Sequence, residues 1–186
     1  MIGVVTAAED LIVDYTPDWK SEFVELGTSL RQALGETAPR IDHVGSTSVP
    51  GLAAKPIVDI QISVPSLEPV DAYRAAIESC GFEWQPDNPE LTKRFFREVP
   101  PRKRTHVHVR RRGSFGEQFA LLFRDYLRVH VERADTYASL KRSVAQLLLT
   151  DRQAYVEAKS PFIWEVIRDA DEWAQETGWM PGGSDA

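Results

Sequence analysis

The spacing of apolar residues predicts β-strands mainly in the first two-thirds of the chain. Runs rich in β-branched residues, or alternating between polar and apolar side chains, are typical of strands. The expected strands cover residues 11–15, 40–44, 56–64, 94–99 and 104–112. The last two are separated by a turn-forming segment rich in proline and basic residues, so we expect them to pair as a hairpin.

Apolar residues three or four positions apart predict helices in the rest of the chain. A first helix begins at Thr16-Pro17, with Thr16 as its N-cap, and ends at Gly35. A second covers residues 69–80, and helices fill the last third, the final one starting again at Ser160-Pro161. Strands followed by helices indicate an α+β fold. We expect one domain over residues 1–180 and a flexible Gly/Ser tail over residues 181–186.

The segment 56–64 is the clearest strand, and it carries a carboxylate in its middle. Its alternation places Asp59 and Gln61 on one face and only apolar side chains on the other. Burying a lone carboxylate costs several kcal/mol, on the order of the effective penalty for a buried ion. Asp59 therefore needs a partner. This is a metal ion at a functional site, several N–H donors, or a cation such as Arg104 or Arg110 in a structural ion pair.

A Gly-Ser-Thr-Ser turn precedes this strand. Gly45 lets the backbone bend and lets a ligand approach closely, and the N–H groups and hydroxyls of Ser46, Thr47 and Ser48 are suited to phosphate oxygens. Lys55 would add a positive charge for the same phosphate. The alternative is a structural turn whose hydroxyls serve as caps.

Two histidines lie on one face of the predicted strand 104–112. His106 and His108 alternate with Val107 and are flanked by Arg104 and Arg110. Two imidazoles at this spacing can ligate one metal ion, and the arginines can contact phosphate. Half-buried histidines that form only structural hydrogen bonds are the alternative.

Composition limits the classes of protein to consider. The 186 residues have a formal charge of −6, 42% hydrophobic residues and one cysteine, Cys80. A folded protein is therefore expected, without an internal disulfide and without a general attraction to nucleic acid or membrane. We expect no secretory leader and no membrane span, and hence a cytoplasmic protein. The sequence does not predict the oligomeric state.

The strongest motif resembles the signature of the GrpB family. It is the segment Ile41-Asp42-His43-Val44-Gly45-Ser46-Thr47-Ser48-Val49-Pro50-Gly51-Leu52-Ala53-Ala54-Lys55-Pro56-Ile57-Val58-Asp59-Ile60. The histidine strand Thr105-His106-Val107-His108-Val109 and the helical block around Phe123-Arg124-Asp125-Tyr126-Leu127-Arg128, followed by Tyr137 and Leu140-Lys141, are similar to later parts of that family. The likeness covers residues 15–173.

The resemblance implies a nucleotidyltransferase-superfamily fold, which is a small mixed sheet backed by helices with a C-terminal helical segment. Relatives fused to dephospho-coenzyme A kinase imply a phosphate or nucleotide context. Gly45 and Ser46 match the superfamily's glycine-serine turn and Asp59 its first carboxylate. The second carboxylate of the usual pattern falls at Gln61, and a neutral amide cannot bridge two Mg²⁺ ions.

Three hypotheses follow for function. The first is an enzyme that uses Mg²⁺ or Mn²⁺ to transfer a nucleotidyl group from a nucleoside triphosphate to an acceptor, with Asp59, Gln61, His106 and His108 as catalytic residues. The second is a non-catalytic module that binds a nucleotide, another phosphate-bearing small molecule or RNA phosphate. The third is a hydrolase or phosphotransferase with one metal ion held by Asp59 and the two histidines.

Overall fold

A computed structural model describes residues 11–186 and contains a five-stranded mixed sheet with the strand order β1-β2-β5-β4-β3. The strands are β1 (Arg40–Val44), β2 (Val58–Val64), β3 (Phe82–Trp84), β4 (Lys93–Glu98) and β5 (Thr105–Arg111). The helices are α1 (Asp18–Leu34), α2 (Asp71–Ser79), α3 (Phe115–Val129), α4 (Val131–Ser143), α5 (Leu147–Thr150) and α6 (Arg152–Thr177). The predicted α+β class is confirmed.

The pairing of β2 fixes which side chains meet at the sheet centre. β2 is antiparallel to β1 and parallel to β5, while β4 and β5 form the predicted antiparallel pair. In this register Asp59 lies opposite His106, and Gln61 lies opposite His108. Because facing residues of paired strands point to the same side, Asp59, Gln61 and both histidines share one face.

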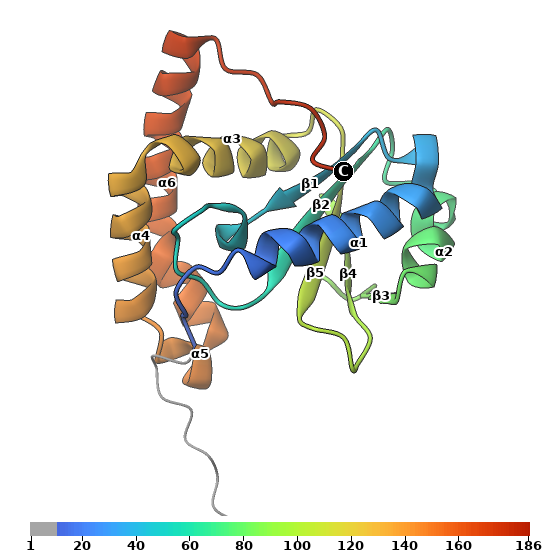
Figure 1. The fold of residues 1–186 in the computed structure, drawn as a ribbon, viewed down its shortest axis with the longest axis horizontal. Coiled ribbons are helices and arrows are strands. Elements are labelled where there is room, and N and C mark those ends of the chain that lie inside the picture. Colours follow the sequence, from blue (N-terminus) through green and yellow to red (C-terminus); the bar gives the residue numbers. More distant parts are fainter. Residues whose placement is uncertain (1–10) are drawn as a thin grey trace, which may run out of the picture.

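Two apolar clusters hold the fold together, one at α1 and α2 and one among α3, α4 and α6. Figure 1 shows α4 and α6 standing apart from α1 and α2. The apolar face of the sheet packs against α1 and α2, around side chains such as Leu30, Ile60 and Ile77. A second cluster joins α3, α4 and α6 with the segment that leads from the Gly45 turn to β2. The helical group therefore stands beside the polar face of β2 and encloses the end that carries Asp59.

Two predicted boundaries are wrong. Only Val13 of residues 11–15 pairs, in an isolated bridge with Ala54, so no regular strand forms there. α6 begins at Arg152 and continues through Pro161, instead of starting again at Ser160-Pro161. A proline removes one backbone donor, but here packing outweighs that loss, because Tyr155 and Val166, on either side of Pro161, are both buried in the second cluster.

The end of the chain lies along β1 and does not fray as the sequence predicts. The backbone N–H of Ala186 donates to the Ile41 carbonyl at 3.1 Å, and the hydroxyl of Ser184 accepts from the Ile41 N–H at 2.8 Å. The Asp185 carboxylate accepts from the His43 N–H and from Arg124. These bonds cover the outer edge of β1, which would otherwise expose unpaired backbone groups.

Candidate active site

Asp59 and the two histidines converge at one point on the polar face of the sheet. Asp59 Oδ1 accepts hydrogen bonds from His106 Nδ1 and His108 Nε2, both at 3.2 Å. The Asp59 side chain is 27% exposed, so it is open to a ligand on one side. Arg104 and Arg110 pair with Glu98 and Glu90 instead, which removes the structural ion pair that the sequence left as an alternative.

The electrostatics keep Asp59 ionised. Burial by itself would raise the pKa of Asp59, but the hydrogen bonds and charges of His106 and His108 outweigh burial and hold that pKa well below its ordinary value. Burial lowers the pKa of His108, against the opposing pull of Asp59. The site therefore presents an anionic oxygen beside two imidazole nitrogens.

Gly45 makes this arrangement sterically feasible. Its backbone has φ 70° and ψ −175°, a combination that is essentially restricted to glycine. A Cβ atom placed on Gly45 would lie 2.6 Å from Asp59 Oδ2 and 3.1 Å from Asp59 Cβ. The turn thus lies directly against the carboxylate, as the Gly-Ser motif followed by Asp59 led us to expect.

A basic cavity of about 240 Å³ opens on one side of Asp59. Gly45, Ser46 and Asp59 line it together with four cationic side chains. These cations are Lys55, Lys141, Arg152 and Lys159. We refer to it as the lysine cavity. Its charge and its size suit a chain of phosphate groups.

Burial and mutual repulsion lower the pKa values of the lysines that line this cavity. Burial lowers the pKa of Lys141 to about 7 and that of Lys159 to about 8, and nearby cations act in the same direction. Burial also lowers the pKa of Lys55. Lys55 and Lys159 both approach the ring of Tyr155, at 5.4 and 4.1 Å from its centroid. A bound anion would reduce the electrostatic repulsion among these cations.

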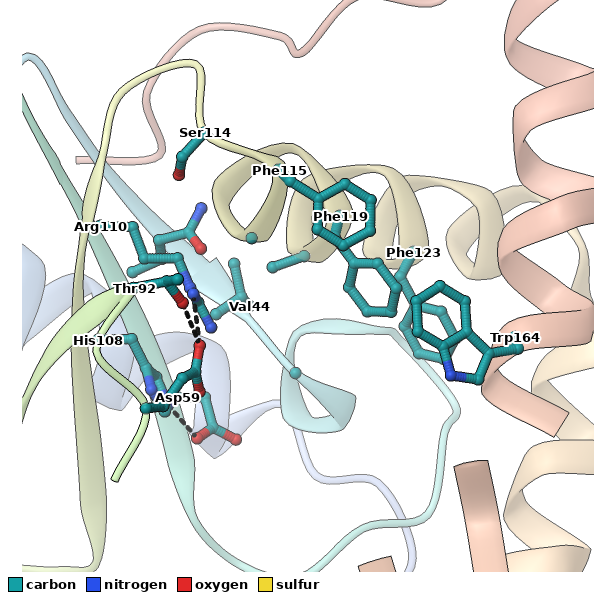
Figure 2. A pocket seen from close by; sticks show the side chains of 15 residues that line it. Val44, Asp59, Thr92, His108, Arg110, Ser114, Phe115, Phe119, Phe123 and Trp164 are labelled. Carbon is teal, nitrogen blue, oxygen red and sulfur yellow. Dashed lines mark hydrogen bonds and ion pairs between the residues drawn. The ribbon is translucent and has the colours of Figure 1, made fainter. Parts of the chain in front are cut away.

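A larger cavity of about 490 Å³ opens on the other side of Asp59, and Figure 2 shows it. Its wall on α3 and α6 is formed by Phe115, Phe119, Phe123 and Trp164. We refer to it as the aromatic cavity. Gly45 and Asp59 line this cavity as well as the lysine cavity, so the carboxylate stands where the two meet.

The structure divides the predicted phosphate-binding residues into two groups. Ser46, Thr47 and Lys55 line the lysine cavity, as the motif suggests. The Ser48 hydroxyl instead donates to the Gly45 carbonyl at 2.6 Å, so it forms a hydrogen bond inside the turn. Thr47 is 2% exposed, and its hydroxyl donates to the Ile57 carbonyl at 3.2 Å. Its hydroxyl is therefore already engaged.

The two predicted arginines lie apart from the lysine cavity. Arg104 is exposed, pairs with Glu98 at 2.9 Å and lines neither cavity, which does not support a phosphate contact there. Arg110 pairs with Glu90 at 2.8 Å and lines the aromatic cavity (Figure 2). β5 places Arg110 on the histidine face, whereas Arg104 precedes this strand; Glu90 on the loop before β4 holds Arg110, and Glu98 on β4 holds Arg104.

Gln61 connects the sheet to α3. It is 1% exposed, and its Nε2 donates to the Glu117 carbonyl at 3.2 Å. Ser63, two residues further along the same face, donates to the Glu117 carboxylate. A catalytic role for Gln61 stays a prediction, because its amide nitrogen is engaged in holding α3 against β2.

The three converging residues fit a single metal ion. One ligand atom from each of Asp59, His106 and His108 lies within 4.8 Å of the other two. Two ligands bound to one ion at about 2.1 Å stand about 3.0–3.4 Å apart in tetrahedral or octahedral geometry. The observed 3.2 Å between Asp59 Oδ1 and each ring nitrogen agrees with that spacing. A carboxylate and two imidazoles suit Mn²⁺ or Zn²⁺ better than Mg²⁺, which prefers oxygen.

Sequence reasoning missed most residues of the C-terminal helices that complete the site. Lys141, Arg152 and Lys159 contribute the charge of the lysine cavity, and α6 contributes Trp164. Trp164 and Phe115 are 56% and 71% exposed. The available signal was a break in the expected apolar stripes, since Lys159 and Trp164 on α6 and Lys141 on α4 need either solvent or a ligand.

A family model described as GrpB protein matches residues 11–169, which include every residue of the site. A crystal structure of the conserved protein GrpB from Enterococcus faecalis is 34% identical, with a TM-score of 0.77, over 87% of this chain and 99% of that one.

Curated relatives extend the comparison to other bacteria. A protein named dephospho-CoA kinase from Mycolicibacterium paratuberculosis is 35% identical over 91% of this chain and 48% of its own length. UPF0157 protein BH1888 from Halalkalibacterium halodurans is 34% identical over 86% of this chain and 82% of its own length. The chain spans about half the length of the first few relatives it matches, so a kinase name describes a protein about twice as long.

Three further observations complete the comparison. Structures of the poly(U) polymerase Cid1 share 14% identity and a TM-score of 0.47 over 72% of this chain and 41–42% of theirs. Within residues 11–186, no helix combines the length and apolar character that crossing a membrane requires. The sequence also has no Gly-Lys pair, so it lacks the phosphate loop typical of P-loop kinases.

Proposed function

This chain belongs to the GrpB protein family, and from the site that its residues form we propose that it is a metal-dependent nucleotidyltransferase. The substrate would be a nucleoside triphosphate whose phosphates occupy the lysine cavity, and the acceptor would carry a hydroxyl group. The observation that carries this proposal is the convergence of Asp59, His106 and His108 within 4.8 Å at the mouth of a cationic cavity.

The proposed reaction is the displacement of pyrophosphate at the α-phosphorus. The acceptor oxygen forms a bond to the α-phosphorus, the bond from that phosphorus to the α,β-bridging oxygen breaks, and the hydroxyl proton passes to solvent. Pyrophosphate, the leaving group, keeps the electrons of the broken bond. Lys55, Lys141 and Lys159 surround the space where its charge would develop.

The remaining residues position these groups. Asp59, His106 and His108 would hold one divalent ion, which supplies Lewis-acid neutralisation of phosphate oxygens when bound. Gly45 brings the backbone of the turn against Asp59, so the turn and the carboxylate border the same cavity. Gln61 offers no second carboxylate, and its amide is committed to α3, so the proposal assigns one ion and not two.

The test combines metal binding with turnover. We would titrate Mn²⁺ into the protein, follow free Mn²⁺ by electron paramagnetic resonance, and measure pyrophosphate release from each α-labelled triphosphate with candidate hydroxyl acceptors. The expected result is one Mn²⁺ per chain and a product in which the labelled nucleotide is attached to an acceptor. Asp59→Asn should weaken Mn²⁺ binding at least 10- to 100-fold, as expected when a metal ligand is replaced.

The matched control is Asp71→Asn, which makes the same change at an exposed position of α2 outside both cavities. It should leave Mn²⁺ binding and turnover unchanged. Full activity of Asp59→Asn, or two Mn²⁺ ions per chain, would show that the assigned site is wrong.

A hydrolase is the second candidate, and the histidine pair favours it. Two imidazoles and one carboxylate with an open side are typical of a site that activates water on one metal ion. Hydrolysis would release a free nucleoside monophosphate even without an acceptor, whereas transfer requires one. A phosphate-binding module without catalysis, which Gln61 favours, would bind triphosphate and Mn²⁺ yet yield neither product.

A further inference from the structure

The wall of the aromatic cavity is unusual for the surface of a folded domain. Phe115 is 71% exposed and Trp164 is 56% exposed, although both belong to well-formed helices. Single exposed aromatic residues are common, but these two join Phe119 and Phe123 in one continuous surface (Figure 2). Such a surface beside a polar site indicates that something planar or apolar covers it.

The aromatic rings of this wall contact one another in both edge-on and near-parallel arrangements. Phe119 meets Trp164 edge to face, with centroids 5.6 Å apart and planes at 71°. Phe115 and Trp164 are almost parallel, at 17°, but their centroids are 6.5 Å apart. Offset-stacked rings have centroids about 4.5–7 Å apart, so this pair is at the wide end of the stacking range. Because Phe115 and Trp164 remain 71% and 56% exposed, much of their ring surface stays open to a ligand.

The two cavities adjoin at more than one place. Gly45 and Asp59 line both of them. Phe123 of the aromatic cavity also meets Tyr137 of the lysine cavity, with ring centroids 5.7 Å apart. A ligand whose phosphates lie among the lysines and whose reacting phosphorus lies at Asp59 would thus extend into the aromatic cavity. The lysine cavity, at about 240 Å³, is less than half the volume of its neighbour.

We infer that the aromatic cavity binds the base of the nucleotide, stacked on Phe115, Phe119 and Trp164. This inference rests on the proposed function, and it adds the part of the substrate that the lysine cavity does not contact. Aromatic stacking accepts any base, because every base presents a π-face. On the opposite side of the cavity, Arg110 and Glu90 form an ion pair that offers polar contacts to the sugar or to the edge of the base.

The experiment compares three probes by calorimetry in the presence of Mn²⁺. Inorganic tripolyphosphate reports on the lysine cavity alone, adenosine on the aromatic cavity alone, and each of the four common nucleoside triphosphates on both. The variant is the double substitution Phe115→Ala and Trp164→Ala. Both side chains are exposed, so the fold should survive their removal.

The wild-type protein should bind all four nucleoside triphosphates more tightly than tripolyphosphate. In the double variant their affinity should fall about 5- to 150-fold, the range for losing one stacked base, while tripolyphosphate binding stays unchanged. Trp164→Phe should retain most of the wild-type affinity. Val156→Ala, an exposed position of α6 outside both cavities, is the control and should change nothing.

Equal triphosphate affinity in the double variant and the wild type would overturn the inference, and so would a wild type that binds triphosphates no better than tripolyphosphate. Neither result would affect the proposed function, which depends on the lysine cavity. Failure of the wild type to bind tripolyphosphate would count against the proposed function itself.

Discussion

Replacing Gly45 by alanine tests the contact on which the site depends. The backbone at Gly45 lies in a region where a non-glycine residue costs about 1–3 kcal/mol. The new Cβ would also lie 2.6 Å from Asp59 Oδ2 and 3.1 Å from Asp59 Cβ. Because Asp59 Cβ is part of the clash, rotating the carboxylate does not relieve it, and overpacking adds about 1–3 kcal/mol. We expect Gly45→Ala to lower the free energy of unfolding by roughly 2–6 kcal/mol in total.

Gly51→Ala is the matched control for that experiment. Gly51 also has a positive φ, of 80°, but no atom lies within 4 Å of a Cβ placed there. It should therefore lose stability through backbone strain alone. With a urea m-value of about 2 kcal/mol/M, the Gly45→Ala midpoint should fall by about 1–3 M, and Mn²⁺ affinity should fall with it. If both variants unfold at the same urea concentration and bind Mn²⁺ equally well, Gly45 does not press on Asp59 and the reasoning is wrong.

Four other outcomes are expected. Tripolyphosphate affinity should decline as pH rises through 7–8, because Lys141 and Lys159 lose their protons there. Calorimetry in different buffers should detect proton uptake on binding, and an affinity that does not change with pH would contradict this. Lys141→Met should stabilise the protein by about 1–4 kcal/mol in urea titrations below pH 7, with the gain vanishing towards pH 10.5, since the buried amine resists charging only in the folded state. Pro161→Ala should raise the free energy of unfolding by roughly 1–3 kcal/mol, measured by thermal melting, because it restores a helical donor. Gln61→Glu should destabilise the fold by about 3–5 kcal/mol without adding a second Mn²⁺ site, because its carboxylate would be buried beside the Glu117 carbonyl; a two-ion titration would refute this.

The central strands of the fold could be predicted from the sequence because their signals are local. The alternation in β2 and the turn before β5 depend on neighbours within a few residues. β3 was missed, since three residues carry too little pattern, and it forms only because β4 pairs with it. The extent of α6 was also missed, because tertiary packing on both sides of Pro161 outweighs the local penalty.

The site could be predicted only where one strand or one turn carries it. Gly45, Asp59, His106 and His108 follow from motif and alternation, and the parallel register of β2 and β5 brings them together. The lysines and aromatic residues of α4, α3 and α6 reach the same place through the packing of helices, which spacing along the chain does not reveal. Arg110 shows the converse limit, because alternation in β5 gives its face correctly but not the glutamate that binds it.

The choice between one metal ion and two depends on α3 as much as on the residue at position 61. Gln61 lines the aromatic cavity together with Asp59, but it is almost fully buried and its amide nitrogen donates to the Glu117 carbonyl of α3, so the residue beside Asp59 is a neutral amide engaged with α3 and not a second carboxylate. The histidines lie on the other strand that borders Asp59, where the side chains are still partly open. In the proposed site, β2 would supply one carboxylate and β5 two imidazoles to a single ion. That ligand set would favour Mn²⁺ or Zn²⁺ over Mg²⁺, which prefers oxygen ligands.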